Sequence, residues 1–116
     1  MKFIRPSTYL RFLNALDCLD RINPSKDLDP IEERLLSYIA IASLRQQDVL
    51  VGDLISMSKL GSQATLHGRV KNLVAMDYVK LIESKEDGRK KFVVPTSKAE
   101  KYFDKLSACL EKACKS

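Results

Sequence analysis

The sequence predicts a mainly α-helical chain with one short β-hairpin, and two regions carry this prediction. A short helix runs into a glycine turn at residues 59–61, and a second amphipathic helix follows over residues 62–76, as in a helix-turn-helix. Residues 78–94 hold two short runs rich in β-branched and aromatic residues around a charged turn. Helix, turn, helix and basic hairpin in this order is the layout of a winged helix-turn-helix, which presents one helix and one loop to the grooves of DNA.

Two further helices are expected before this core. Ser7 can cap a first helix that runs to about Ile22, where the proline-containing stretch 23–25 ends it. The start of the second helix has the clearest cap in the sequence. Asp29 is the expected N-cap, and Glu32 follows it by three residues, which is the spacing of a capping box. Both helices carry apolar residues at three-and-four spacing.

The helix-turn-helix begins with a short third helix after residues 49–51. Gly61 is expected to take a positive φ in the tight turn, because glycine does so at little cost. Ser62 can cap the fourth helix, and Asp77 can take the left-handed conformation that ends it. The residues of this helix expected to face the core are Leu66, Val70, Leu73 and Val74.

The hairpin and a last helix complete the prediction. The expected strands are Tyr78–Ile82 and Lys91–Val94, and Asp87-Gly88 between them is a hairpin signal. Thr96 or Ser97 can cap the last helix. We therefore expect a single winged-helix domain over residues 1–116. It has N-terminal helices at about 7–45, the winged core at about 49–96 and a C-terminal helix at about 97–115.

Positive charge is placed unevenly along the chain, which has a net charge of +5. Residues 1–58 carry a net charge of −1, whereas residues 59–91 hold 8 basic and 4 acidic side chains. The excess thus falls on the helix-turn-helix and the hairpin, as expected of a surface that binds a polyanion. The alternative interpretation is charge that serves solubility alone.

Several functional classes receive no support from the sequence. We expect a cytoplasmic protein, because no signal peptide or membrane-spanning run is present. Cys18, Cys109 and Cys114 are odd in number and lack metal-ligand spacing, so neither a disulfide scaffold nor a metal site is expected. His67 is the only histidine, and no catalytic set or phosphate-binding loop accompanies it, so we expect neither an enzyme nor a cofactor.

The stretch from about Val49 to Phe103 resembles the MarR family of bacterial winged-helix regulators. The most specific part is the hairpin, where Asp87-Gly88-Arg89 is similar to the family's Asp-x-Arg. Thr96 falls where the family's threonine opens the last helix. The chain departs from the family pattern at Asp77, which replaces a usual glycine, and at Gly68, where a basic residue is frequent.

The layout and the resemblance together predict a DNA-binding site. The fourth helix is the expected recognition helix, and Gly68 can let its backbone approach DNA closely. The resemblance implies that Arg89 enters the minor groove and that the nearby carboxylate of Asp87 holds Arg89 in place and so stabilises the wing. The predicted DNA-binding residues are Ser62, Gln63, Thr65, His67, Arg69, Lys71, Lys85, Arg89 and Lys90. Arg69 and Lys71 are better suited to phosphates than to bases.

These features predict a sequence-specific, double-stranded DNA-binding transcription regulator that acts as a homodimer. The first and last helices carry apolar stripes that are broad for a small domain, and members of the family pair these helices around a two-fold axis. The resemblance also implies a small-molecule effector. Two alternatives remain: a winged helix that binds an acidic protein, and a module for plasmid replication or partition. Peroxide sensing through Cys18 with Cys109 or Cys114 is a further hypothesis.

Overall fold

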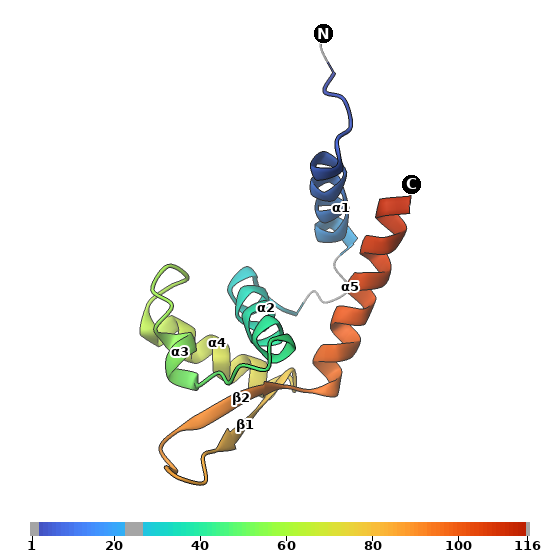
Figure 1. Cartoon of the computed structure of the whole chain (residues 1–116). Coiled ribbons are helices and arrows are strands. Elements are labelled where there is room, and N and C mark those ends of the chain that lie inside the picture. Colours follow the sequence, from blue (N-terminus) through green and yellow to red (C-terminus); the bar gives the residue numbers. More distant parts are fainter. Residues whose placement is uncertain (1–2, 23–26, 116) are drawn as a thin grey trace. The chain divides into compact units, whose positions relative to one another are not determined.

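The computed structural model describes residues 3–22 and 27–115 (Figure 1). Its elements in chain order are α1 (Thr8–Ile22), α2 (Pro30–Leu44), α3 (Val51–Ile55), α4 (Gln63–Ala75), β1 (Val79–Glu83), β2 (Lys91–Pro95) and α5 (Ser97–Lys115). Residues 27–100 form one compact unit, whereas α1 and the part of α5 from Lys101 onward belong to a second unit. Within the described ranges, no helix has the length and apolar character needed to span a membrane.

Helix α2 begins as its sequence predicts and provides much of the core of the larger unit. An Asp29 carboxylate oxygen accepts the Glu32 N–H at 2.7 Å, and a Glu32 carboxylate oxygen accepts the Asp29 N–H at 2.9 Å. This reciprocal pairing confirms the capping box, which satisfies N–H groups that a helix start leaves free. Leu35, Leu36 and Ile39 on the same helix are fully buried.

The turn between α3 and α4 differs from the prediction at Gly61. No glycine among the described residues has a positive φ, so the expectation for Gly61 is wrong. The chain instead reverses just before the glycine, where the Leu60 N–H donates to the Met57 carbonyl at 2.9 Å. A Cβ at Gly61 would lie 3.5 Å from Thr65 Cγ2, which is an ordinary contact. Gly61 is therefore not required here for its backbone freedom.

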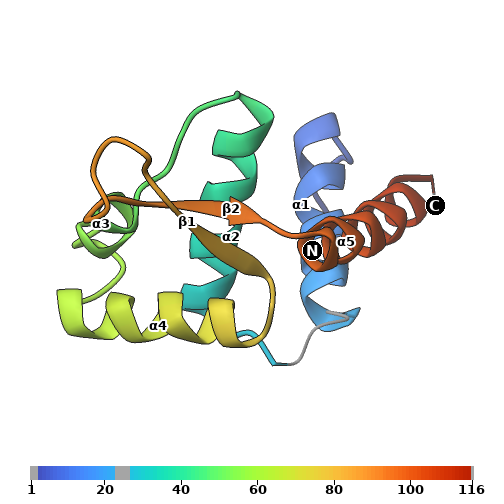
Figure 2. The same ribbon diagram turned by 90° about the horizontal axis from the view of Figure 1, so that it is seen from below.

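Helix α4 lies crosswise to α2 (Figure 2) and packs against α2, α3 and β1. Ser62 caps it as predicted, since its hydroxyl oxygen accepts the Thr65 N–H at 3.2 Å. Leu66, Val70 and Leu73 are buried, as their spacing predicts. Val74, also expected in the core, is 36% exposed, so that expectation is wrong. Its side chain lies beside the hairpin, on the wall of a surface groove.

The end of α4 is fixed by a left-handed residue and by the segment that opens α5. Asp77 has a φ of 64°, as predicted, and the Tyr78 N–H donates to the Leu73 carbonyl at 3.0 Å. The Thr96 hydroxyl donates to the Asp77 carbonyl at 2.6 Å and also accepts the Ala99 N–H at 3.3 Å. Thr96 thus caps α5 while it holds the corner where α4 meets β1.

Strands β1 and β2 pair antiparallel, with Val79 opposite Pro95 and Glu83 opposite Lys91. Each strand ends one residue later than predicted. An isolated bridge joins Leu50 to Phe92, and the Val93 N–H donates to the Val49 carbonyl at 2.8 Å. The sequence did not predict that residues 49–50 pair with β2 beside the two hairpin strands. This pairing attaches the hairpin to the start of α3.

In the second unit, α1 is capped by Ser7, whose hydroxyl oxygen accepts the Leu10 N–H at 3.3 Å, as predicted. The predicted helix stop at residues 23–25 lies outside the described residues. Part of the apolar stripe of α1 is exposed in the single chain: Tyr9 by 66%, Phe12 by 45% and Leu13 by 40%. Cys18 and Cys109 are half-buried free thiols, and the side chain of Cys114 lies outside the described part.

Candidate nucleic-acid interface

The outward face of α4 carries small and polar side chains. Gln63, Thr65, His67 and Lys71 are all exposed. Nothing lies within 4 Å of a Cβ built at Gly68, so the backbone of the helix is open to the outside at this position. Three buried residues on the opposite side, Leu66, Val70 and Leu73, anchor the helix and leave this face free for a ligand.

Arg69 lies apart from the other predicted contact residues of α4. Its guanidinium Nε is 2.6 Å from a carboxylate oxygen of Asp29, at the N-terminus of α2. The two groups form an ion pair whose N–H direction does not fit a hydrogen bond. The charge of Arg69 is therefore partly neutralised within the protein. Its predicted role at a phosphate remains an expectation, and it is the weakest of the set.

The wing tip, residues 84–90, is an organised loop. The Ser84 N–H donates to the Lys90 carbonyl at 2.9 Å, and the Lys90 N–H donates to the Asp87 carbonyl at the same distance. Asp87 contributes its carboxylate as well, which accepts the Arg89 N–H at 3.0 Å. Gly88 has no positive φ, so the turn is not the glycine-dependent type typical of two-residue hairpins.

Asp87 thus orders the wing through the main chain of Arg89. Among the described residues, the ion pairs involve Arg21 with Asp17 and Arg69 with Asp29, and neither includes the Arg89 guanidinium. The Arg89 side chain is exposed at the tip. The Arg89 guanidinium is therefore available to a ligand. The Asp87 carboxylate, which was expected to hold this side chain, accepts the main-chain N–H of Arg89 and orders the loop.

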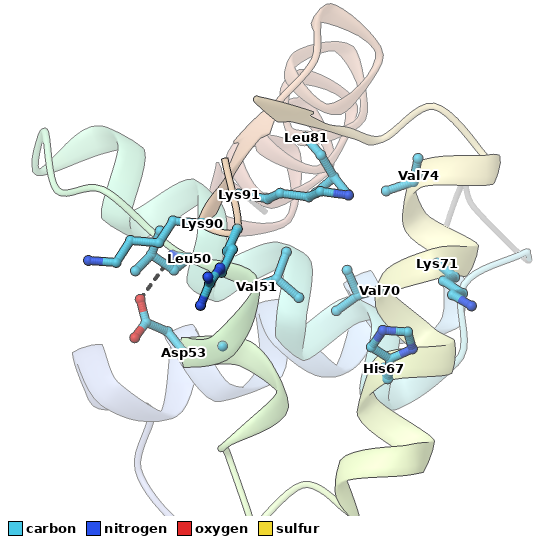
Figure 3. Close-up of a pocket in the computed structure, with 12 residues that line it drawn as sticks. Leu50, Val51, Asp53, His67, Val70, Lys71, Val74, Leu81, Lys90 and Lys91 are labelled. Atoms are coloured by element: carbon cyan, nitrogen blue, oxygen red, sulfur yellow. Dashed lines mark hydrogen bonds between the residues drawn. The ribbon is translucent and has the colours of Figure 1, made fainter. Parts of the chain in front are cut away.

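A groove of about 590 Å³ connects the recognition-helix candidate to the wing (Figure 3). Its apolar wall consists of Leu50, Val51, Val70, Val74 and Leu81. Its cationic or polar lining consists of His67, Lys71, Arg89, Lys90 and Lys91. In Figure 3 a hydrogen bond of 2.9 Å from the Leu50 N–H to the Asp53 carboxylate fixes the start of α3 beside it.

The groove brings together four of the predicted site residues: His67, Lys71, Arg89 and Lys90. Ser62, Gln63, Thr65 and Lys85 are exposed but do not line it. Lys91 lines the groove as well, and its place beside Lys90 in the charged turn predicts a phosphate contact. The contribution of Leu50 depends on its bridge to Phe92, which no local pattern indicates.

No group of His, Cys, Asp and Glu side chains in the described ranges has an arrangement that could hold a metal ion. The site consists of the exposed face of α4 and the wing tip, and both carry exposed cations. These are the features by which winged helices meet a duplex.

Comparison with known proteins gives matches at the level of structure. No family model matches the sequence, and no curated protein is similar to it in sequence. Among solved structures, the transcriptional regulator Tm0710 from Thermotoga maritima has a TM-score of 0.66 at 22% identity, covering 90% of this chain and 67% of that one. The heme sensor PefR from Streptococcus agalactiae, in complex with heme, has a TM-score of 0.65 at 18% identity, covering 88% and 67%.

A third similar structure is a point mutant of MepR from S. aureus, bound to an oligodeoxyribonucleotide. It has a TM-score of 0.64 at 15% identity and covers 90% of this chain and 71% of that one. These proteins are MarR-family regulators. The chain has the winged-helix fold of the MarR-type regulators. In this fold, α4 is the second helix of the helix-turn-helix and residues 84–90 form the tip of the wing.

Proposed function

We propose that this chain is a sequence-specific, double-stranded DNA-binding transcription regulator of the MarR-like type, which acts as a homodimer. One observation carries the proposal: exposed cations from α4 and from the wing tip line a single groove, with Lys71 on the helix and Arg89 and Lys90 on the loop. A helix and a loop that carry charge on one surface fit the major groove and the adjoining minor groove of one duplex.

Each part of the interface has its own role in this proposal. Gln63, Thr65 and His67 face the base edges in the major groove, and Lys71 binds a phosphate. Arg89 enters the minor groove, where negative potential is concentrated, and Lys85 and Lys90 bind the flanking phosphates. Ser62 caps α4 through the Thr65 N–H, so that its hydroxyl lies at a helix N-terminus, which is favourable for a phosphate.

The structural neighbours support this assignment and add a further element. The MepR mutant was solved with an oligodeoxyribonucleotide bound, and PefR with heme. BpsR from Bordetella bronchiseptica, at a TM-score of 0.57, is described as having its DNA binding regulated by 6-hydroxynicotinic acid. We extend the proposal to a small-molecule effector, of a chemical class that these neighbours do not specify for this chain. A regulator of this kind acts in the cytoplasm, beside the chromosome.

The homodimer is proposed from the exposed apolar stripe of α1. Phe12 and Leu13 keep 45% and 40% of their surface exposed in the single chain, and a second copy would cover them. Leu13→Asp should convert the dimer to a monomer in sedimentation velocity at micromolar concentration. Asn14→Asp is the matched control, because Asn14 follows Leu13 in the sequence but projects to the other side of the helix. A wild-type chain that sediments as a monomer would contradict the dimer.

The decisive test is selection of bound duplexes from a random DNA pool at about 0.15 M salt. Enrichment of an inverted repeat, with half-sites about 10 bp apart, is the expected result. Binding without enrichment would favour a role in DNA processing, such as plasmid replication or partition, over promoter control. A complete absence of binding would contradict the proposal and favour an acidic protein partner.

A further inference from the structure

Glu32 is the buried charged residue of the described chain, with an exposed fraction of only 4%. Both of its carboxylate oxygens have a partner. One accepts the Asp29 N–H at 2.9 Å, within the capping box of α2, and the other accepts the Asn72 side-chain amide on α4 at 3.0 Å. A carboxylate that is nearly out of water depends strongly on such partners, because an unpaired buried charge is costly.

Asp29 divides its two oxygens in the same way. One accepts the Glu32 N–H at 2.7 Å and completes the capping box. The other lies 2.6 Å from the Nε of Arg69 on α4. The capping box therefore uses one oxygen of each carboxylate to begin α2 and the second oxygen to hold α4. Its two attachment points on α4, Arg69 and Asn72, are three residues apart and so lie on one side of that helix.

We propose that the capping box of α2 sets the position of the recognition helix, with Asp29 and Glu32 as positioning residues that do not themselves touch DNA. The inference rests on the proposed function of α4. Apolar packing between α2 and α4 is non-directional, whereas the hydrogen bond from Asn72 fixes a distance and a direction, and the ion pair of Arg69 fixes the distance of a second point. Two such links fix both the rotation of α4 about its axis and its displacement along α2. That geometry decides which side chains reach the bases.

The consequence is a specific loss of discrimination. A recognition helix that is rotated or shifted still meets phosphates, since these contacts depend mainly on charge. Its base contacts require placement to within a fraction of an ångström, so they suffer first. Weakening the links should therefore lower the ratio of affinity for a selected duplex to affinity for a scrambled one, with a smaller effect on the scrambled duplex alone.

Asn72 offers the cleanest variants, because it takes no part in the cap of α2. Asn72→Asp replaces the donor by a carboxylate that repels Glu32, and the affinity ratio should fall about tenfold. Adding Glu32→Gln to this variant restores the pair with reversed polarity, since the glutamine amide can donate to the new carboxylate while its oxygen keeps the cap. The double variant should return to within about threefold of the wild-type ratio. Because both duplexes carry the same phosphate charge, the ratio cancels the change in net charge.

The angle between α2 and α4, measured by NMR residual dipolar couplings without DNA, provides an independent measurement. The angle should change in Asn72→Asp and return in the double variant. Should Asn72→Asp fail to fold, Asn72→Ala removes the donor without adding charge and should show the same change with a smaller amplitude. A wild-type angle together with a wild-type affinity ratio in the folded single variant would overturn the inference, as would a double variant that recovers neither.

The two proposals fail in different ways. If the wild-type protein does not distinguish the two duplexes, the proposed function is wrong and the claim about DNA discrimination falls with it. The angle measurement still decides whether the capping box positions α4. If the wild type discriminates and Asn72→Asp discriminates equally well, only the positioning role is refuted.

Discussion

The outward face of α4 and the tip of the wing differ in how they carry charge. On α4 the exposed positions are mostly neutral, Lys71 is an exposed cation, and the charge of Arg69 is paired with Asp29. The wing region exposes four cations, Lys85, Arg89, Lys90 and Lys91. None of them takes part in the ion pairs found among the described residues. The two parts of the proposed interface thus differ in their chemistry.

Under the proposed function, this difference predicts separate roles for the two regions. Exposed, unpaired cations attract phosphates regardless of sequence, and their contribution to affinity falls as salt rises. Neutral polar side chains on a rigid helix add little to that attraction, but they can donate to or accept from base edges. The wing should therefore supply most of the affinity and α4 most of the sequence preference. Each prediction that follows changes one of the two regions and leaves the other intact.

The largest effect is expected from removing the charge of the wing. Lys85→Gln, Arg89→Gln and Lys90→Gln together should weaken binding to every duplex by about a hundredfold or more at about 0.15 M salt. The slope of log affinity against log salt should become shallower by roughly 2 to 3, because each lost phosphate contact removes about 0.9. Fluorescence anisotropy across a salt series measures both values. An unchanged slope would show that the wing does not touch the DNA backbone.

Arg89 alone should account for a substantial share of this effect. Arg89→Ala should weaken binding by about 1–3 kcal/mol, while the cap by Asp87 survives because it uses the main-chain N–H. Circular dichroism should show an unchanged melting temperature. Arg89→Lys is the matched control, since it keeps the charge and loses the guanidinium. Full recovery in that variant would reduce the role of Arg89 to a simple phosphate contact.

On α4, a neutral and a charged residue should separate the two kinds of contact. Gln63→Ala should relax the preferred base at one position of each half-site, at a cost of about 1 kcal/mol, with the salt slope unchanged. Lys71→Gln should leave the preferred DNA sequence unchanged and should make the slope of log affinity against log salt shallower by about 0.9. Selection from a random pool, repeated with each variant, gives the preference. If the two variants behave alike, the division of labour within α4 is wrong.

The smallest effect is expected at Gly68, where stability and binding should move in opposite directions. The open space around this position accepts a methyl group, so Gly68→Ala should raise the free energy of unfolding by about 0.5–1 kcal/mol. The same methyl group would keep the backbone of α4 away from the duplex and should weaken binding. Chemical denaturation and anisotropy test the two halves. Stronger stability with unchanged affinity would show that the backbone does not approach DNA here.

Local patterns in the sequence predicted the elements and their ends well. Asp29, Ser62 and Thr96 are caps whose hydrogen bonds reach residues only three positions away, and Asp77 ends α4 in the left-handed conformation that was expected. Such features depend on neighbours in the chain, so the sequence displays them directly.

What could not be predicted depends on contacts between distant residues. The pairing of Arg69 with Asp29 and of Asn72 with Glu32 joins residues 40 positions apart, so no local pattern showed that a predicted phosphate ligand also forms an ion pair within the protein. The exposure of Val74 and the bridge between Leu50 and Phe92 depend on where the hairpin lies. The wrong expectation at Gly61 has another cause, since the turn that precedes it already reverses the chain.

The most direct measurement is an NMR titration of the isotope-labelled protein with a duplex selected from a random pool. The largest amide shifts are expected at two separate stretches, residues 62–71 of α4 and its cap and residues 85–91 of the wing. The outer surface of α2, at Tyr38 and Ile41, should remain unaffected. Shifts concentrated on α2, or on only one of the two stretches, would contradict a duplex held jointly by helix and wing.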